Sequence, residues 1–518
     1  MPLPPQESWT VAKPAIRAEG GIIVAQNARA AAVGAEILAA GGNALDAAVA
    51  TAFALGVLEP WMSGLGGTGL LVYGGAQGEV AVVDFTAVSA QALDPRLYPL
   101  AAGTSDDLFG WPLVEGDRNV KGYAAICVPG SVDGLGLALE RFGRMSFAEV
   151  IAPAAALAEE GLPVDWYTVL QIALGAAELA EFDSSRAVFL PQGSPPVPTQ
   201  SGLPKRLPLP ALAATYRRLQ QAGRRDLYEG ELAQTLLADL KAGGSVIAAG
   251  DLAAYRARIV APLTLDYRGA RLHAAPGLTG GPTYARALAA LAGRISGRAD
   301  AEAFILYAES LRAAFAERFR AMGHAMPAAS NTTHLSVVDR AGNMVALTNT
   351  LLSRFGSRVV LPRTGIVMNN AMMWFDPTPG RANSIAPGKR PLANMCPVLA
   401  TRDGVPLFAL GACGGRRIIP AVTQLTSFLL DLDLSLDAAF AAPRIDASTP
   451  AVVCDARLGP GIIEALAQRF PIEMVEATVY PPHFAMPSAV MRAAEGGHVG
   501  ATHALSPAAA AIAAPSAR

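Results

Sequence analysis

The N-terminal part of the chain contains apolar runs of two different periods. Gly21–Ala25 is short and β-rich, whereas Ala30–Ala40 has helical composition and stops at a Gly-Gly pair. Asn43 is a favourable N-cap, and the long apolar stretch after it predicts a second helix. Two further β-rich runs, Leu70–Tyr73 and Val80–Phe85, are separated by turn residues and are expected to pair as strands.

The middle of the chain has a mainly helical pattern. Residues 131–260 carry helical spacing with Gly143 and Gly161 as stop signals, and helices are expected to dominate up to about Arg320. Gln192–Pro210 contains six prolines and few long apolar side chains, so it is predicted to be a surface loop. We find no internal repeat and no long linker, and therefore expect one large unit.

The C-terminal third is again β-rich. Thr333–Asp339 and Met344–Thr350 flank the turn residues Ala341-Gly342-Asn343, which predicts a hairpin. β-rich segments on both sides of a helical middle favour sheets covered by helices, a layered α/β arrangement. The Ala/Pro/Ser-rich stretch Pro507–Arg518 is expected to fray. Further strands are expected at Gly365–Met368, Val398–Thr401 and Leu407–Leu410, followed by a helix beginning near Gly415.

Composition and charge exclude several classes of protein. The 52% hydrophobic content and formal charge of −2 are typical of a folded chain, not a disordered one. No basic cluster indicates nucleic-acid binding, and Glu36 and Asp46 interrupt the longest apolar region, so no membrane span is expected. The N-terminus lacks the pattern of a secretory signal, which makes the cytoplasm the expected location.

Metal and cofactor chemistry find no support in the sequence. The four cysteines match no zinc pattern and are expected to be buried apolar residues, and the six histidines show no ligand spacing. Ser63–Gly69 is glycine-rich but lacks the Lys-Ser/Thr ending of a phosphate-binding loop. We therefore expect no metal and no cofactor.

Thr332 lies where a polar loop, Ser330-Asn331, runs into an apolar strand. By pattern alone, a threonine at this position is most often an ordinary strand residue. The chemical alternative is that the bond between Asn331 and Thr332 is cut, so that the new α-amine stands beside its own hydroxyl. An α-amino group titrates near pH 8 and can accept the hydroxyl proton, so one residue would supply both nucleophile and base.

The segment Thr332–Asp339 with Gly342-Asn343 resembles the catalytic hairpin of the γ-glutamyltransferase (glutathione hydrolase) family, whose members are N-terminal-nucleophile hydrolases. Six further motifs follow in family order across the chain. They are Ala40–Ala48, Ser63–Gly67, Val128–Gly134, Lys389–Leu392, Gly414–Ile419 and Ala442–Arg444. The resemblance implies a four-layer αββα sandwich built from a large chain, 1–331, and a small chain, 332–518, which together form one structural unit. It further implies a heterodimer of these chains, alone or paired as a dimer of heterodimers.

The resemblance also assigns roles within the site. Thr332 matches the nucleophile, and Thr350, eighteen residues on, matches the threonine that orients it. Gly414 and Gly415 match the pair whose backbone N–H groups face the oxyanion. His334 has a family counterpart with a structural or maturation role, and strand alternation points it to the same side as Thr332.

Substrate recognition is where the sequence departs from the family pattern. Glutathione-cleaving members hold the glutamyl group with charged and polar side chains at positions that here read Thr86, Leu352, Ala371, Trp374 and Ala393-Asn394. A glutamyl zwitterion would lose its partners there, which costs several kcal/mol per desolvated charge. The apolar stretch 371–375 is either ordinary core or a pocket. The segment between Phe375 and Lys389 is shorter than in the family, and the missing part resembles the lid loop over the glutamyl site, so we expect an open apolar mouth that admits a bulkier acyl group.

The expected activity is hydrolysis of a small-molecule amide by a self-processed enzyme. Relatives with similar losses are cephalosporin acylase-like enzymes, which remove glutaryl-type groups, and oxamate amidohydrolases. Arginines could anchor a substrate carboxylate, with Arg416 ranked ahead of Arg417, Arg354 and Arg358 because of its place beside the glycine pair. Two alternatives remain open: a glutathione hydrolase or transpeptidase with rebuilt recognition, and an uncut, non-catalytic family member.

Overall fold

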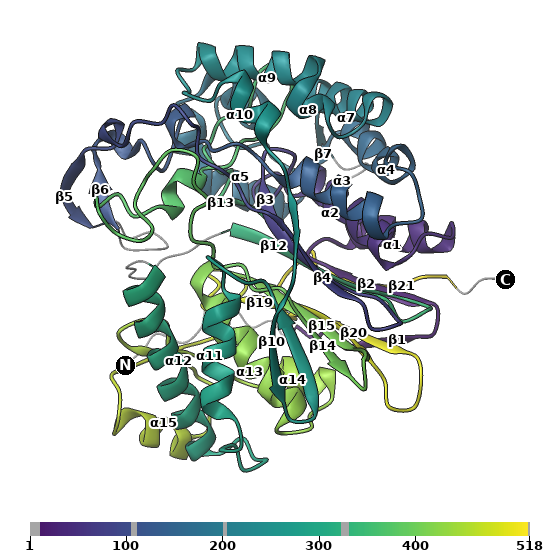
Figure 1. Ribbon diagram of the computed structural model, residues 1–518, viewed down its shortest axis with the longest axis vertical. Coiled ribbons are helices and arrows are strands. Elements are labelled where there is room, and N and C mark those ends of the chain that lie inside the picture. The colour runs from purple at the N-terminus through teal and green to yellow at the C-terminus, as the bar shows by residue number, and fades with distance from the viewer. Residues whose placement is uncertain (1–10, 105–110, 200–204, 323–330, 516–518) are drawn as a thin grey trace.

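Two stacked β-sheets with helices on both outer faces make up the protein (Figure 1). The computed structural model describes residues 11–104, 111–199, 205–322 and 331–515. Within these residues the order of layers is helix, sheet, sheet, helix, so the expected four-layer αββα sandwich is confirmed.

Each large sheet has seven strands, and all the recorded strand pairs within them are antiparallel. The upper sheet of Figure 1 has the order β21 (Ala510–Ala513), β2 (Gly21–Ala25), β12 (Asn331–Asp339), β13 (Met344–Leu352), β3 (Thr68–Gly74), β4 (Val80–Phe85) and β9 (Arg258–Val260). The lower sheet has the order β1 (Ile16–Ala18), β20 (His498–Thr502), β19 (Met486–Arg492), β15 (Val405–Cys413), β14 (Val398–Arg402), β11 (Ala270–Ala274) and β10 (Leu263–Tyr267).

Helices from the first half of the chain lie above the upper sheet, and later helices lie below the lower one (Figure 1). The upper group is α1 (Ala28–Ala39), α2 (Ala44–Leu58), α3 (Ser131–Phe142), α4 (Phe147–Glu160), α5 (Trp166–Leu179), α6 (Asp183–Phe189), α7 (Pro210–Ala222), α8 (Asp226–Glu229), α9 (Glu231–Ala242) and α10 (Ala249–Ala254). The lower group is α11 (Gly281–Leu291), α12 (Ala301–Met322), α13 (Ile418–Leu430), α14 (Leu436–Ala441) and α15 (Pro460–Ala467).

Short elements complete the fold at its margins. They are the small sheets β16 (Ile445–Asp446), β17 (Val452–Asp455) and β18 (Ile472–Val475), β5 (Leu100–Thr104) and β6 (Pro112–Val114), and β7 (Leu162–Pro163) and β8 (Arg206–Leu207), with the 3₁₀ turns η1 (Pro95–Leu97), η2 (Glu115–Asp117), η3 (Tyr123–Ala125), η4 (Ala371–Trp374) and η5 (Gly415–Arg417).

Helix α2 shows how the sequence dictates burial. All fifteen of its residues are buried, as expected for a helix that is apolar on every side. Asn43 caps its first turn in a capping box with Asp46, which confirms the predicted N-cap.

Strict alternation along the strands divides the core into layers. In β2, Ile23 and Ala25 pack with the upper helices, whereas Ile22 and Val24 lie in the cluster between the two sheets. The same alternation sends Leu335 and Val337 of β12 toward the helices. The side chains between them in sequence therefore face the opposite sheet.

Close approach of the two sheets requires glycine in β15. A Cβ on Gly411 would lie 2.2 Å from Cε1 of His334 in β12. Farther along, a Cβ on Gly74 would lie 2.7 Å from Leu399 and 3.3 Å from Pro406, next to the turn end of the β12–β13 hairpin. The start of β15 thus lies at the turn end of the hairpin, and its end, at Cys413, lies at the open end.

Both sheets take strands from each side of the bond between Asn331 and Thr332. In the upper sheet, β12 lies between β2 and β13, and β13 lies between β12 and β3. In the lower sheet, β11 from the first part pairs with β14 from the second. A cut at this bond would leave the two pieces hydrogen-bonded along several strands.

Some predicted elements differ from the observed ones. Gly365–Met368 is no strand; it makes only isolated bridges, through Met368 to Gly66 and through Val367 to Val360. The expected run of helices up to Arg320 is interrupted by β9, β10 and β11, since Leu263–Tyr267 alternates apolar and polar residues as a sheet edge does. Pro507–Arg518 is not frayed throughout, because β21 pairs with β2; residues 516–518 lie outside the described residues.

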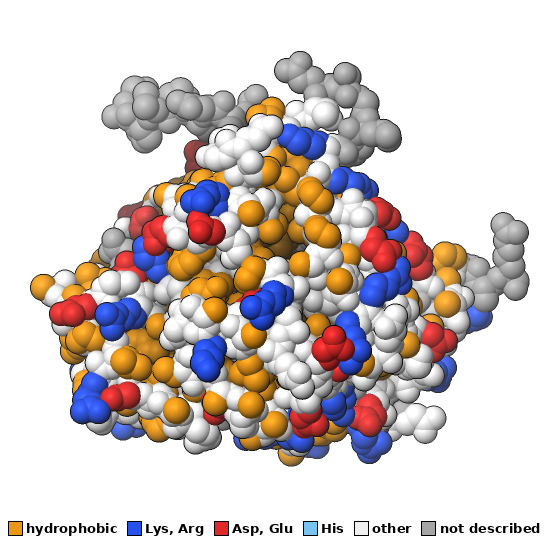
Figure 2. Space-filling view, turned by 90° about the horizontal axis from the view of Figure 1, so that it is seen from above, with side chains coloured by type: hydrophobic (Ala, Val, Ile, Leu, Met, Phe, Trp, Pro, Cys, Tyr) orange, Lys and Arg blue, Asp and Glu red, His pale blue; other side chains and the backbone are white. Residues whose placement is uncertain are grey.

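The expectations for cysteines, apolar helices and charge can also be compared with the structure. The four cysteines are buried thiols without disulfides. No helix in the described part of the chain is long and apolar enough to cross a bilayer. Figure 2 shows acidic and basic side chains interspersed over one face of the molecule, as the nearly balanced charge leads one to expect. The predicted loop at Gln192–Pro210 falls partly on residues 200–204, which lie outside the described residues.

We predict that Gly411→Ala destabilises the protein by about 1–3 kcal/mol, because the added methyl group overlaps the His334 ring, which hydrogen bonds hold in place. Gly250→Ala is the matched control, since a Cβ there meets nothing within 4 Å. Urea unfolding of the three proteins measures the difference. Equal stability of wild type and Gly411→Ala would contradict the close sheet contact.

Candidate active site

Thr332 and Thr350 lie at the open end of the β12–β13 hairpin, on the face between the two sheets. The alternation that buries Leu335 and Val337 under the helices points Thr332 and His334 toward β15. The register of the hairpin shifts between Asn331 and Thr333, so the strand is irregular where the two threonines meet.

The two hydroxyl groups are in direct contact. Thr332 Oγ1 donates to Thr350 Oγ1 at 3.2 Å, and Thr350 Oγ1 also accepts the Leu352 backbone N–H at 2.8 Å. Thr332 is 2% exposed and Thr350 is fully buried. The Thr332 oxygen is therefore held in one place by a partner that the backbone itself fixes.

A second layer of hydrogen bonds supports Thr350 from behind. Asn349 Oδ1 accepts the Ser131 hydroxyl at 2.7 Å and the Thr350 backbone N–H at 3.1 Å. The backbone N–H groups of Gly130 and Ser131 both donate to Gly67 O. The separate motifs Ser63–Gly67 and Val128–Gly134 thus meet beside Thr350. Ser131 belongs to one of the sequence motifs, whereas no motif or pattern in the sequence pointed to Asn349.

The glycine pair lies directly after β15, at the same end of the sheets as Thr332. Gly414 and Gly415 have φ of +132° and +64°, and a Cβ on Gly414 would lie 2.9 Å from Ala485 Cα. The positive φ disfavours a side chain at both positions, and close packing also excludes one at Gly414. Among the described residues, neither backbone N–H donates to a loop or turn carbonyl, so this turn can offer donors to a bound group.

His334 is a buried side chain whose two ring nitrogens both contact hydroxyl groups of strand residues. Its ring contacts Thr348 Oγ1 at 2.9 Å and Ser336 Oγ at 3.1 Å, and complete burial lowers its pKa to about 3. Both ring nitrogens already have partners within the strands, so the ring is not directed at Thr332 as a base. His324, another of the six histidines, lies outside the described residues.

Three of the expected recognition residues lie in packed core. Leu352, Ala371 and Trp374 belong to the apolar cluster between the sheets, and each is at most 2% exposed. Of the two interpretations of this stretch, the structure has core packing, so the expected open apolar mouth is not found at these residues.

Thr86 and Asn394 are held in polar networks near this cluster. The Thr86 hydroxyl donates to Asp84 Oδ1 at 2.6 Å and accepts from Arg390 at 3.0 Å. Asn394 Oδ1 accepts from Arg318 at 2.8 Å, and burial lowers the pKa of Arg318 to about 9. Each of these two side chains therefore accepts a hydrogen bond from an arginine of the protein itself.

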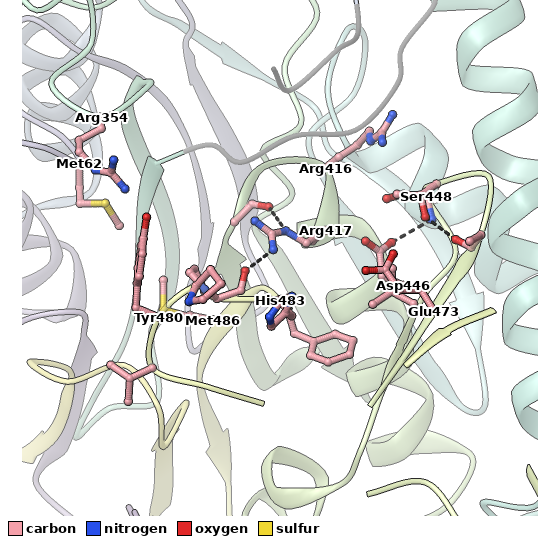
Figure 3. A pocket seen from close by; sticks show the side chains of 18 of the residues that line it. Met62, Arg354, Arg416, Arg417, Asp446, Ser448, Glu473, Tyr480, His483 and Met486 are labelled. Atoms are coloured by element: carbon pink, nitrogen blue, oxygen red, sulfur yellow. Dashed lines mark hydrogen bonds between the residues drawn. The ribbon is translucent and has the colours of Figure 1, made fainter. Parts of the chain in front are cut away.

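A cavity of about 460 Å³ adjoins the glycine turn (Figure 3). Its lining includes Gly414, Arg416, Arg417 and Arg354, whereas Thr86, Leu352, Ala371, Trp374 and Asn394 are not part of it. Met62 also lines it, and its backbone O accepts the N–H of Leu351, next to Thr350. The cavity therefore reaches the neighbourhood of the two threonines.

Arg416 is the most deeply buried of the arginines along this cavity. It is 3% exposed, its guanidinium lies over the Phe319 ring at 5.9 Å, and burial lowers its pKa to about 10. Its Nε and Nη2 atoms have no hydrogen-bond partner among the described residues. Arg358 is different, because it is paired with Glu178 at 2.8 Å.

Comparison with known proteins connects this geometry to a family. The model of a family described as gamma-glutamyltranspeptidase matches residues 30–327 and 320–512. The Acylase ACY 1 proenzyme of Pseudomonas sp. (strain V22) is 34% identical over 511 residues, covering 90% of each chain. The Glutathione hydrolase proenzyme of Pseudomonas sp. (strain A14) is 31% identical over 483 residues, covering 83% of this chain and 82% of its own. A crystal structure of cephalosporin acylase from Bacillus halodurans has the same fold, with a TM-score of 0.86 at 24% identity over 99% of each chain.

The buried His334 predicts an acid-sensitive stability. Because its folded-state pKa is about 3, the unfolded chain binds one more proton than the folded chain between about pH 3 and pH 6.5. The stabilisation is therefore complete above pH 6.5 and falls by about 1.4 kcal/mol per pH unit as the pH drops through that window.

Urea unfolding of wild type and His334→Gln from pH 7 to pH 4.5 measures this linkage. In the variant, the free energy of unfolding should fall less steeply with decreasing pH, by the contribution of one proton, whatever the variant's stability at pH 7. An identical slope in both proteins would show that His334 is not kept neutral by burial.

Proposed function

The chain belongs to the gamma-glutamyltranspeptidase family, and we propose on that premise that it is an amidohydrolase which cuts itself between Asn331 and Thr332. The large piece, 1–331, and the small piece, 332–518, remain together as a heterodimer, because both sheets contain strands from each piece. The observation that carries the proposal is the contact between the hydroxyl groups of Thr332 and Thr350 beside the glycine turn.

In this proposal the freed α-amine of Thr332 accepts the proton of its own hydroxyl. The Thr332 oxygen attacks the substrate amide carbon, and the backbone N–H groups of Gly414 and Gly415 bind the resulting oxyanion. Each such donor lowers the activation free energy by about 3 kcal/mol. The amine half of the substrate leaves with the proton, and water then hydrolyses the acyl ester on Thr332. Thr350 keeps the attacking oxygen in place throughout.

The proposed substrate is an amide other than a γ-glutamyl compound. Leu352, Ala371 and Trp374 offer no charged partner to a glutamyl zwitterion, and leaving such charges unpaired costs several kcal/mol. We propose the amide of a small carboxylic acid, of glutaryl or oxamate type, with Arg416 available as a carboxylate partner. The similarity to the Acylase ACY 1 proenzyme supports this choice.

A glutathione hydrolase activity is the second candidate, since the Glutathione hydrolase proenzyme is 31% identical over most of the chain. It would require recognition groups other than the residues at the glutamyl positions.

We expect purified wild-type protein to consist of two chains that meet at Asn331 and Thr332, and Thr332→Ala to stay uncut. Intact-mass spectrometry separates the two outcomes. Thr333→Val is the matched control, because it removes a neighbouring buried hydroxyl that has no hydrogen-bond partner in the described part of the chain, and it should be cut normally. An uncut wild-type chain with activity would refute the mechanism and point to a different nucleophile.

Substrate preference is expected to exclude γ-glutamyl compounds. We predict that kcat/KM for glutaryl-4-nitroanilide or for oxamate exceeds that for γ-glutamyl-4-nitroanilide by about 100-fold or more, the equivalent of at least one unpaired buried charge. Initial-rate assays with the three compounds decide the question. Faster turnover of the glutamyl anilide would favour the glutathione hydrolase.

A further inference from the structure

A second, much smaller cavity adjoins the one beside the glycine turn. Its volume is about 10 Å³, which is the room that a single water molecule or a single monatomic ion needs. One short segment contributes to the walls of both cavities, through Pro482, His483, Phe484 and Met486. The small cavity therefore lies next to the candidate active site, but a substrate or a polyatomic ion such as phosphate does not fit into it.

Arg444 lines this small cavity as a buried cation that lacks a counter-ion. It is 5% exposed, and its Nη2 donates to Ala485 O at 3.2 Å, whereas its Nη1 has no hydrogen-bond partner among the described residues. In the same part of the chain Arg444 forms no salt bridge, while the neighbouring Arg457 pairs with Asp455 at 2.6 Å. A buried guanidinium without its own anion is costly, so the position calls for a negative charge.

The other groups around the cavity add to its positive character. Among the described residues in its lining, Asp455 is the one acidic side chain, against the guanidinium groups of Arg444 and Arg457. Burial and the charges of Arg444, Arg457 and Lys13 lower the pKa of His503 to about 3, so its ring is neutral. Its Nδ1 has no partner among the described residues either. In the tautomer with a proton on Nδ1, this ring donates a hydrogen bond to an anion.

The segment between the two cavities connects Arg444 to the glycine turn. Ala485 accepts the Arg444 hydrogen bond through its carbonyl, and its Cα lies 2.9 Å from where a Cβ on Gly414 would be. Arg417, which follows the glycine pair, donates to Pro482 O. The same few residues thus contact Arg444 on one side and the turn that offers backbone donors on the other.

We propose that the small cavity binds one chloride ion, which Arg444 and His503 hold by hydrogen bonds, and that this ion keeps residues 482–486 in place against the Gly414 turn. Chloride supplies the missing negative charge and accepts N–H donors from several directions within a single sphere. A water molecule in its place would leave the charge of Arg444 without compensation. The site is distinct from the proposed amide hydrolysis and does not depend on it.

Bromide soaked into crystals of the wild-type protein tests the site directly, because bromide replaces chloride and has an anomalous signal. We expect an anomalous peak within hydrogen-bonding reach of Arg444 Nη1 and His503 Nδ1. In solution, replacement of gluconate by chloride at constant ionic strength should raise the midpoint of thermal unfolding by about 2 °C, since the ion binds only the folded state. Arg444→Gln should abolish this rise, whereas Arg340→Gln, a change at an exposed arginine in the β12–β13 turn, should preserve it.

Two results would overturn the proposal. They are a small cavity without bromide in the wild-type crystals, and a chloride-dependent rise of the same size in Arg444→Gln. If Arg444→Gln does not fold, His503→Leu takes its place, because it removes one donor and keeps the guanidinium; about tenfold more chloride should then be needed for the same rise. A bromide peak in wild type without any effect of chloride on unfolding would contradict the role of the ion in holding residues 482–486.

Discussion

The contact between the hydroxyl groups of Thr332 and Thr350 is the interaction on which the candidate site depends. A threonine side chain on a strand end would ordinarily rotate or face water. Here the backbone N–H of Leu352 fixes Thr350, and Asn349 with Ser131 fixes the strand behind it. The oxygen of Thr332 is consequently preorganised in a buried place, where electrostatic interactions are stronger than in water.

The packing of the two sheets against each other brings the end of β15 and the open end of the β12–β13 hairpin together. Gly411 lets β15 approach His334 of β12, and the Gly414 turn follows three residues later in the chain. Because both sheets contain strands from each side of residue 331, a cut there would leave both pieces hydrogen-bonded into both sheets. The same arrangement serves the continuous chain and the proposed cleaved one.

The expected recognition residues divide between the core and the cavity that adjoins the glycine turn. Leu352, Ala371 and Trp374 belong to the apolar core between the two sheets. Arg354, Arg416 and Arg417, in contrast, line the cavity that adjoins the glycine turn. A charged group of a substrate would therefore find partners in this cavity and not among these core residues.

The sequence by itself determined the layers, the β12–β13 hairpin, the cap at Asn43 and the candidate nucleophile, because local periodicity and short motifs express these directly. It could not supply Asn349 as a support of Thr350, the edge strands β9 and β21, or the core role of Leu352 and Trp374. Each of these depends on contacts between segments far apart in the chain, which no local pattern records. The cavity charge is the clearest case: four arginines near the site look alike in sequence, and only the fold pairs Arg358 with Glu178 while it leaves Arg354 facing a cavity.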